Sequence, residues 1–273
     1  MFGNMNETID FLKGKINRKP LVGIITGTGL DSVTDSMNIE QEISYEEIPN
    51  FPQSTVPGHA GKLVFGPIAG KPVITMKGRF HIYEGYKVSD VTMPVRVMAK
   101  LGIRYLFISS AAGGLNPDFK SGELMAIEDH INLTADNPLI GRNSGKSTTR
   151  FLDMISAYDK DLLLSAKKKA KKENIILNHG TYIGITGPSL ETPAETKFFR
   201  TIGGDAIGMS TVNEVIEAVY CGLKVLTIVA ITNVNLPESM KSISIEEIIE
   251  NARKASGKIA ILFSGIIKEL IND

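Results

Sequence analysis

The stretch that decides the fold is KVLTIVAIT, residues 224–232. Branched and other apolar side chains fill it, without the polar alternation of a strand that has one face in water. A run of this kind is typical of a strand buried on both faces in the middle of a sheet. It ends at Asn233, at the edge where parallel sheets bind ligands, although a terminal asparagine is usually a turn residue.

Shorter apolar runs alternate with helix-period segments along the rest of the chain. Further strands are expected at residues 21–26, 62–65, 71–76, 105–109, 123–128, 181–186 and 205–208. Helices are expected at residues 91–101, 193–202, 212–221 and 245–270, the last with apolar residues at helical spacing. The alternation predicts an α/β protein with a mixed, mainly parallel sheet flanked by helices. Without repeats or composition breaks, residues 1–273 are expected to form one domain.

The composition argues against several classes of protein. Thirty basic residues balance thirty acidic ones, so no overall field attracts nucleic acid or an anionic membrane. The single cysteine, Cys221, excludes an internal disulfide and fits a reducing cytoplasm. The N-terminal residues 1–20 do not resemble a signal peptide, and no stretch has the length and apolar content of a membrane helix. A cytoplasmic protein without a nucleic-acid or membrane partner is expected.

The segment GRFHIYEGY, residues 78–86, carries the most informative polar pattern. It follows the apolar run 73–76, so its first residues are expected to continue as extended chain, in which alternate side chains share a face. Arg79, His81 and Tyr83 would then point the same way. Arginine offers a fork of donors to phosphate or carboxylate oxygens, and histidine adds a donor or a proton. The pattern fits an anion pocket as well as it fits a solvated edge strand.

Three turns after expected strands are rich in small residues, which let backbone N–H groups approach an anion closely. The first contains Thr28, the second is residues 111–114, and the third contains Ser210. Each turn is weak evidence alone, because tight strand–helix turns need glycine for structural reasons. Together with the polar segment at residues 78–86, the three turns favour a phosphate site.

Other motifs carry less weight. Residues 27–32 lack the third glycine of a dinucleotide fingerprint, and residues 141–147 have one residue too few for a P-loop. The four histidines show no paired spacing, so no metal site is expected. Glu191 lies between an expected strand and the helix at residue 193, where a buried carboxylate could bind a ligand. The alternative is an ordinary acidic residue near a helix N-terminus.

Taken together, these pieces resemble the trimeric purine nucleoside phosphorylases over nearly the whole chain. The similarity rests on blocks in the same order, namely GTGL at 27–30, VPGHAG at 56–61, residues 78–86, AAGGLNP at 111–117, DHINL at 129–133, GPSLET at 187–192, GMST at 208–211 and ITN at 231–233. The resemblance implies a three-layer α/β/α fold of the nucleoside phosphorylase type. It also implies reversible phosphorolysis of a purine nucleoside to a free base and a pentose 1-phosphate, as in purine salvage.

The resemblance also implies a role for each site residue. Phosphate would be held by Thr28, His59, Arg79, His81, the Ala111 backbone amide and Ser210; the ribose would contact Tyr83 and Met209; and the purine would contact Glu191, Asn233, Ala112 and Gly113. The catalytic residues would be His81, Asn233 and Glu191. Phe151 matches a phenylalanine that reaches into a neighbouring subunit's pocket, so a homotrimer is implied. Phosphate is then a co-substrate, and no cofactor or metal is required.

The chemistry of the expected purine end predicts inosine and guanosine, with their 2′-deoxy forms, as substrates. The Asn233 amide offers a donor to a 6-oxo group and an acceptor to a protonated N7 at the same time. Glu191 can accept from N1–H. An aspartate at position 233 would suit a 6-amino group instead.

Two departures from the family pattern leave alternatives open. Leu190 stands where many relatives carry an aromatic ring against the base. Ile245 aligns with a histidine that binds the 5′-hydroxyl, although the helical pattern allows Ile245 to be a core residue. An apolar 5′ end favours a second hypothesis, a phosphorylase of 5′-methylthio nucleosides (methylthioinosine or methylthioadenosine), whose adenosine form Asn233 argues against. A nucleosidase uses water in place of phosphate, so it would not need the anion donors. The near-complete set of site residues argues against a non-catalytic binding protein.

Overall fold

The computed structural model describes residues 5–55, 60–142 and 150–271. The strands of these residues join one mixed sheet in the order β2-β3-β4-β1-β5-β8-β7-β6-β9. Because β9 also pairs with β5, the second half of the sheet closes on itself. The strands are β1 Val22–Ile25, β2 Gln41–Ser44, β3 Lys62–Ile68, β4 Lys71–Lys77, β5 Tyr105–Gly114, β6 Leu124–Leu133, β7 Leu177–Ile185, β8 Ala206–Gly208 and β9 Lys224–Val234.

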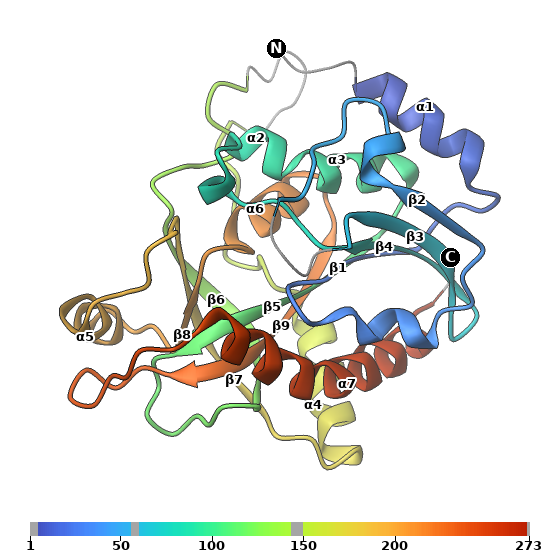
Figure 1. The fold of residues 1–273 in the computed structure, drawn as a ribbon. Coiled ribbons are helices and arrows are strands. Elements are labelled where there is room, and N and C mark those ends of the chain that lie inside the picture. The colour runs from blue at the N-terminus through green and yellow to red at the C-terminus, as the bar shows by residue number, and fades with distance from the viewer. Residues whose placement is uncertain (1–4, 56–59, 143–149, 272–273) are drawn as a thin grey trace.

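Helices cover both faces of the sheet (Figure 1). One layer holds α1 Met5–Lys15, α2 Val88–Val91, α3 Met93–Leu101 and α6 Val212–Tyr220, and the opposite layer holds α4 Lys160–Lys172 and α7 Ile245–Glu269. The remaining long helix, α5 Pro193–Thr201, lies at one end of the molecule. The three-layer α/β/α architecture with a mixed sheet is therefore confirmed. No helix in the described part of the chain is long and apolar enough to cross a membrane.

The strand β9 is central, as its composition predicts. It runs parallel to β5 and antiparallel to β6, and its residues from Val225 to Thr232 are buried. The pairing with β5 is regular up to Ala112 and Ile231, and the next pair is Gly113 with Asn233. Thr232 is thus left without a partner on β5, which makes it a β-bulge.

The bulge is supported by side chains from two other segments. The Thr232 carbonyl accepts hydrogen bonds from the Ser121 hydroxyl at 2.8 Å and from the Asn251 amide at 2.8 Å. A buried carbonyl that leaves the ladder of a sheet needs such partners. The extra residue is therefore a built feature of the strand, and it lies immediately before Asn233.

Most expected elements are present, and the differences have local causes. The two strands expected at residues 62–65 and 71–76 are present as β3 and β4 and form an antiparallel hairpin, and Gly102 ends α3 in the left-handed conformation with φ 105°. Residues 111–114 were expected to form a strand–helix turn, but this prediction is wrong: they continue β5, where Gly113 and Gly114 pair with β8. The helix α1 was not expected, because it is mostly polar and buries only Thr8, Ile9 and Leu12.

Candidate active site

A cavity of about 920 Å³ opens where the carboxyl ends of β1, β4, β5, β8 and β9 meet. Its wall is built by the residues after these strands together with the segment from Ile185 to Glu191 and the start of α7. Ends of parallel strands are the edge at which α/β folds bind ligands, because side chains and backbone N–H groups converge there. The cavity has the size expected of a small-molecule site.

Most of the predicted site residues line this one cavity. These are Thr28, Arg79, His81, Tyr83, Ala111, Ala112, Gly113, Glu191, Met209, Ser210 and Asn233. They come from six separate stretches of the chain, and the fold brings them together. His59 lies outside the described residues. Phe151 does not line the cavity, and its side chain is 87% exposed.

The segment after β4 presents its polar side chains as the alternation predicts. His81 is in the extended conformation, and the short helical turn η3 Ile82–Glu84 follows. The rings of His81 and Tyr83 are stacked with centroids 4.6 Å apart, so both lie on the cavity side. Phe80 points the other way and is buried among aromatic side chains of the core.

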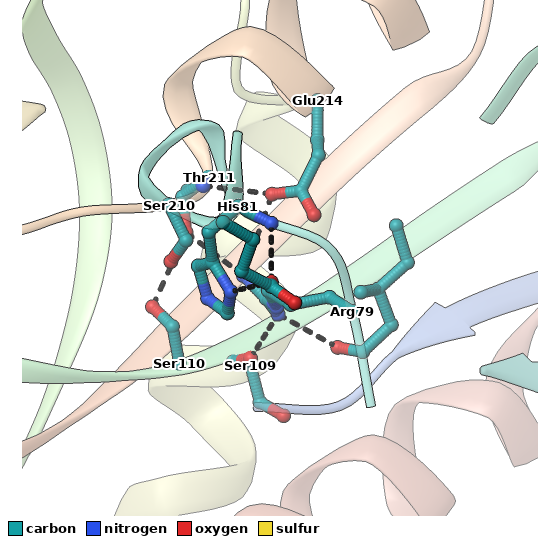
Figure 2. Close-up of polar contacts among 9 residues, drawn as sticks. Arg79, His81, Ser109, Ser110, Ser210, Thr211 and Glu214 are labelled. Atoms are coloured by element: carbon teal, nitrogen blue, oxygen red, sulfur yellow. Dashed lines mark hydrogen bonds and ion pairs between the residues drawn. The ribbon is translucent and has the colours of Figure 1, made fainter. Parts of the chain in front are cut away.

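Arg79 lines the cavity and is only 1% exposed, and Figure 2 shows its polar partners. Its guanidinium forms an ion pair with Glu214 at 3.3 Å and donates to the backbone carbonyls of Ile25 and Ser109. The Glu214 carboxylate therefore offsets the charge of Arg79. An anion in this part of the cavity would depend on hydrogen-bond donors at least as much as on net charge.

Thr211 holds a rare backbone conformation next to these residues. Its φ of 81° and ψ of −57° form a γ-turn, in which the Val212 N–H donates to the Ser210 carbonyl at 2.9 Å. This turn is strained for a branched residue and persists only where the surroundings fix it. Here the Thr211 N–H donates to Glu214 at 2.7 Å, and the Thr211 hydroxyl lies 3.2 Å from that of Ser110. The strained turn holds Ser210, which lines the cavity.

His81 is held by an acidic partner that the sequence pattern did not reveal. The Glu84 carboxylate accepts from the His81 backbone N–H at 2.8 Å and lies 2.9 Å from Nδ1 of its ring. It also accepts from the Thr55 hydroxyl at 2.6 Å. Burial alone would raise the pKa of Glu84, but the hydrogen bonds from His81 and Thr55 outweigh it and lower the pKa to about 2. The carboxylate thus stays ionised at neutral pH and fixes the orientation of the His81 ring.

The opposite end of the cavity contains a carboxylate and two amides. Asn235 donates through its amide to the Glu191 carboxylate and accepts from the Asn233 amide at 2.8 Å. Burial raises the pKa of Glu191, and the hydrogen bond from Asn235 partly offsets this shift. Thr192 and Glu195 form the capping box of α5, so the first turn of that helix is capped without Glu191. Glu191 is therefore not a capping residue of α5, and it lines the cavity.

An apolar wall lies between the two ends and the solvent. It includes Met209, Leu190 and the first turn of α7 with Ile245. The alternative that Ile245 belongs to the core is wrong, because its side chain is 68% exposed and lines the cavity. The core contribution of α7 starts only at Ala252.

Four functional candidates were missed from the sequence: Glu84, Thr211, Glu214 and Asn235. Glu84 follows His81 by three residues, a spacing that could have indicated a contact in a turn. Thr211 and Glu214 form the capping box of α6, a local pattern that could have indicated their contact, whereas the contacts of Glu214 with Arg79 and of Asn235 with Glu191 join segments far apart in the chain. Within the described residues, no group of three or more His, Cys, Asp or Glu side chains could hold a metal ion.

Comparison with known proteins agrees with this geometry. The sequence profile of the phosphorylase superfamily matches residues 21–268. The chain is 47% identical to purine nucleoside phosphorylase 1 of Bacillus subtilis, over 95% of this chain and 96% of that protein. The fold is similar to that of a Schistosoma mansoni purine nucleoside phosphorylase in complex with adenosine, with a TM-score of 0.93, 36% identity, and 99% and 98% of the two chains covered.

A second structure from the same organism is equally close. Isoform 2 of the Schistosoma mansoni enzyme, in complex with cytosine and ribose-1-phosphate, has a TM-score of 0.93 at 38% identity and covers 99% of this chain and 97% of that one. Identity at this level over nearly the full length is accompanied by the same fold. The chain therefore belongs to the phosphorylase superfamily and, within it, to the purine nucleoside phosphorylases.

Proposed function

We propose that this protein is a pentosyltransferase that catalyses the reversible phosphorolysis of purine nucleosides to the free base and a pentose 1-phosphate. The observation that carries the proposal is the single cavity itself. One end of it gathers hydrogen-bond donors suited to an anion, and the other end pairs a carboxylate with an amide suited to a purine edge. The space between the two ends is lined by Tyr83 and Met209, which we assign to the pentose.

Inorganic phosphate is assigned to the donor-rich end. The Thr28 and Ser210 hydroxyls and the Ala111 backbone N–H would donate to its oxygens, with the His59 and His81 side chains beside them. Because Glu214 offsets the charge of Arg79, Arg79 acts mainly by fixing Glu214 and, through it, the Thr211 turn that presents Ser210. A preorganised set of donors of this kind can hold a nucleophile in line with the anomeric carbon.

The purine end would stabilise the departing base. As the glycosidic bond breaks, positive charge builds on the sugar beside the phosphate, and electrons move into the purine. The side-chain carbonyl of Asn233 can accept a hydrogen bond from a protonated N7 while its NH₂ group donates to O6. The Glu191 carboxylate can accept a hydrogen bond from N1–H. The bond between C1′ and a phosphate oxygen forms as the bond from C1′ to N9 breaks, so neither a protein nucleophile nor a cofactor is needed.

These contacts favour inosine and guanosine, with their 2′-deoxy forms, over adenosine. The names of the relatives described above favour this assignment over a 5′-methylthio-nucleoside phosphorylase. Exchange of Asn233 for aspartate, which can accept from a 6-amino group, should shift kcat/KM from inosine towards adenosine. An unchanged ratio in Asn233→Asp would contradict the assigned purine contact.

The experiment that tests the function is a substrate panel. Inosine, guanosine, adenosine and methylthioinosine are incubated with and without phosphate, and free base and sugar 1-phosphate are quantified by chromatography. We expect rapid release of hypoxanthine and guanine that requires phosphate and yields one pentose 1-phosphate per base. Base release at the same rate without phosphate would show a hydrolase and refute the proposal.

We further propose that the protein works in the cytoplasm as a homotrimer in which Phe151 completes the neighbouring cavity. The support is a group of exposed apolar side chains close in sequence, Ile140, Phe151 and Ile155, which a lone chain would leave in water. Sedimentation should give three times the mass of one chain, and a monomer would contradict the proposal.

A mixing experiment tests the role of Phe151 directly. Phe151→Ala and Asn233→Ala are each expected to be weakly active alone. Subunits of the two variants, dissociated and reassembled together, should regain activity, because some cavities then combine an intact Asn233 with an intact Phe151. The control is Ile176→Ala, an exposed apolar residue elsewhere, which should keep full activity. No recovery in mixed trimers would show that Phe151 does not act between subunits.

A further inference from the structure

A chain of hydrogen bonds connects the carboxylate and the amides at the purine end. The Thr232 hydroxyl lies 2.9 Å from the Asn233 carbonyl oxygen, the Asn233 amide nitrogen lies 2.8 Å from the Asn235 carbonyl oxygen, and the Asn235 amide donates to Glu191. Glu191, Asn233 and Asn235 all line the cavity. Asn235 connects Asn233 to Glu191, the two groups assigned to the purine.

The direction of each hydrogen bond is set by the one before it. An ionised carboxylate can only accept, so Asn235 must turn its NH₂ group towards Glu191. The carbonyl of the Asn235 side chain then faces Asn233, and it can only accept as well. Asn233 must therefore turn its own NH₂ group towards Asn235, which fixes the orientation of its amide.

The fixed amide keeps one free donor and one free acceptor position. The Asn233 NH₂ group has two hydrogens, and Asn235 uses one of them. The Asn233 carbonyl oxygen has two lone pairs, and the Thr232 hydroxyl lies close to one of them while also lying 3.2 Å from the Ala112 carbonyl. The remaining hydrogen suits the 6-oxo group of a purine, and the remaining lone pair suits a proton on N7.

Asn235 is itself firmly placed. It is 9% exposed, and its backbone N–H donates to the Gly114 carbonyl at 2.8 Å. Gly113 leaves room for the side chain, since a methyl group there would lie 3.2 Å from the Asn235 amide nitrogen and 3.5 Å from the Glu191 carboxylate. The position after the bulge puts residues 233 and 235 on the same side of the strand end, because side chains two apart share a face.

We propose that Asn235 is a specificity-determining positioning residue, which transmits the acceptor-only character of Glu191 to Asn233 and so selects 6-oxopurines. The proposal rests on the function proposed above. A 6-amino group needs an acceptor where a 6-oxo group needs a donor, so adenosine requires the Asn233 amide to turn over. Turning it would bring the side-chain carbonyl oxygens of Asn233 and Asn235 together. Each of these acceptors would then be buried without a donor, which is unfavourable.

Two variants of Asn235 separate this role from simple packing. Asn235→Leu has a similar volume but no polar group, so the Asn233 amide is free to turn. We expect the ratio of kcat/KM for inosine to kcat/KM for adenosine to fall about tenfold or more. Asn235→Asp keeps an acceptor for Asn233 but cannot donate to Glu191, so the ratio should stay within about twofold of the wild type even if both activities fall.

The matched control is Asn178→Leu. Asn178 donates its amide to the Glu123 carboxylate at 2.9 Å, so it makes the same kind of bond, but neither residue lines the cavity. This variant should leave the substrate ratio unchanged. A residue that acted only through stability would reduce the rates with both nucleosides alike in Asn235→Leu, with no change in the ratio.

The results distinguish this proposal from the function on which it rests. If the wild type shows no phosphate-dependent cleavage of any nucleoside, the proposed function fails first. If the wild type cleaves inosine but Asn235→Leu keeps its substrate ratio, or if the ratio falls equally in Asn235→Asp, the positioning role is refuted and the function stands. If Asn235→Leu does not fold, the ratio of kcat/KM for inosine to kcat/KM for adenosine in Asn235→Asp decides. A large fall in this ratio contradicts the positioning role of Asn235, and an unchanged ratio supports it.

Discussion

The ion pair beneath the cavity gives a prediction that the structure makes quantitative. Arg79 and Glu214 lie 3.3 Å apart, with side chains 1% and 4% exposed. At an effective dielectric constant of about 20, two charges at this separation attract by about 5 kcal/mol. Much of this is offset by the loss of hydration, but removal of one partner leaves the other charge buried and alone. We therefore expect Glu214→Ala to lower the free energy of unfolding by about 3–5 kcal/mol.

The second function of Glu214 is to accept from the Thr211 N–H at the start of α6. Glu214→Gln can keep this hydrogen bond while it removes the charge. The difference in the free energy of unfolding between the alanine and glutamine variants should therefore equal the contribution of the capping hydrogen bond alone, about 1 kcal/mol. For a chain of 273 residues, the full loss in Glu214→Ala corresponds to a fall in Tm of roughly 5–9 °C.

The assay is thermal unfolding of the purified variants, followed by calorimetry at neutral pH. Glu250→Ala is the control, because Glu250 pairs with Lys254 at 2.8 Å on the exposed side of α7 and both side chains are more than half exposed. Exposed pairs contribute little, so this variant should melt close to the wild type. If Glu214→Ala melts no lower than Glu250→Ala, the buried pair does not hold the site together and the reasoning is refuted.

Two further predictions concern residues of the cavity wall. Burial raises the pKa of Glu191, so its ionised form is less stable in the folded chain than in the unfolded chain. Glu191→Gln should therefore raise Tm at pH 7, although activity is lost. The gain in Tm should shrink as the pH is lowered towards 4.5, the ordinary pKa of the carboxyl group. A constant or absent gain over this pH range would contradict the shift. Gly208→Ala would put a methyl group 2.2 Å from the hydroxyl oxygen of the buried Tyr182, so it should lower the stability by about 1–3 kcal/mol. Tyr182→Phe in the same chain removes that oxygen and should restore part of the loss in calorimetry; no recovery would show that the clash is with the backbone instead.

The fold was largely predictable because its signals are local. The apolar run of β9, the hairpin of β3 and β4 and the glycine that ends α3 each depend on neighbours in the sequence. Residues 111–114 were misassigned because glycines after a strand usually mark a turn. Here Gly113 and Gly114 stay in the sheet, since they pair with the short strand β8, whose position the sequence does not reveal.

The site was predictable as a set of residues but not as a network. Alternation along residues 78–83 and the resemblance to a known family together identified eleven of the residues that line the cavity. Neither could show that Glu214 neutralises Arg79, because the two residues are 135 positions apart. Asn235 escaped notice for a different reason. It lies two residues beyond the ITN block that carries the resemblance, and its bond to Glu191 joins two segments 44 positions apart.

The bulge also makes purine recognition depend on the length of the chain. Loss of one residue between Ile231 and Asn233 would restore regular pairing and rotate both asparagines to the opposite surface of the sheet. Exchanges of side chain at positions 233 and 235 can adjust which base is accepted, whereas a one-residue insertion or deletion would abolish the recognition as a whole. Enzymes descended from this one should therefore diversify their substrates at this strand by substitution and keep its spacing fixed.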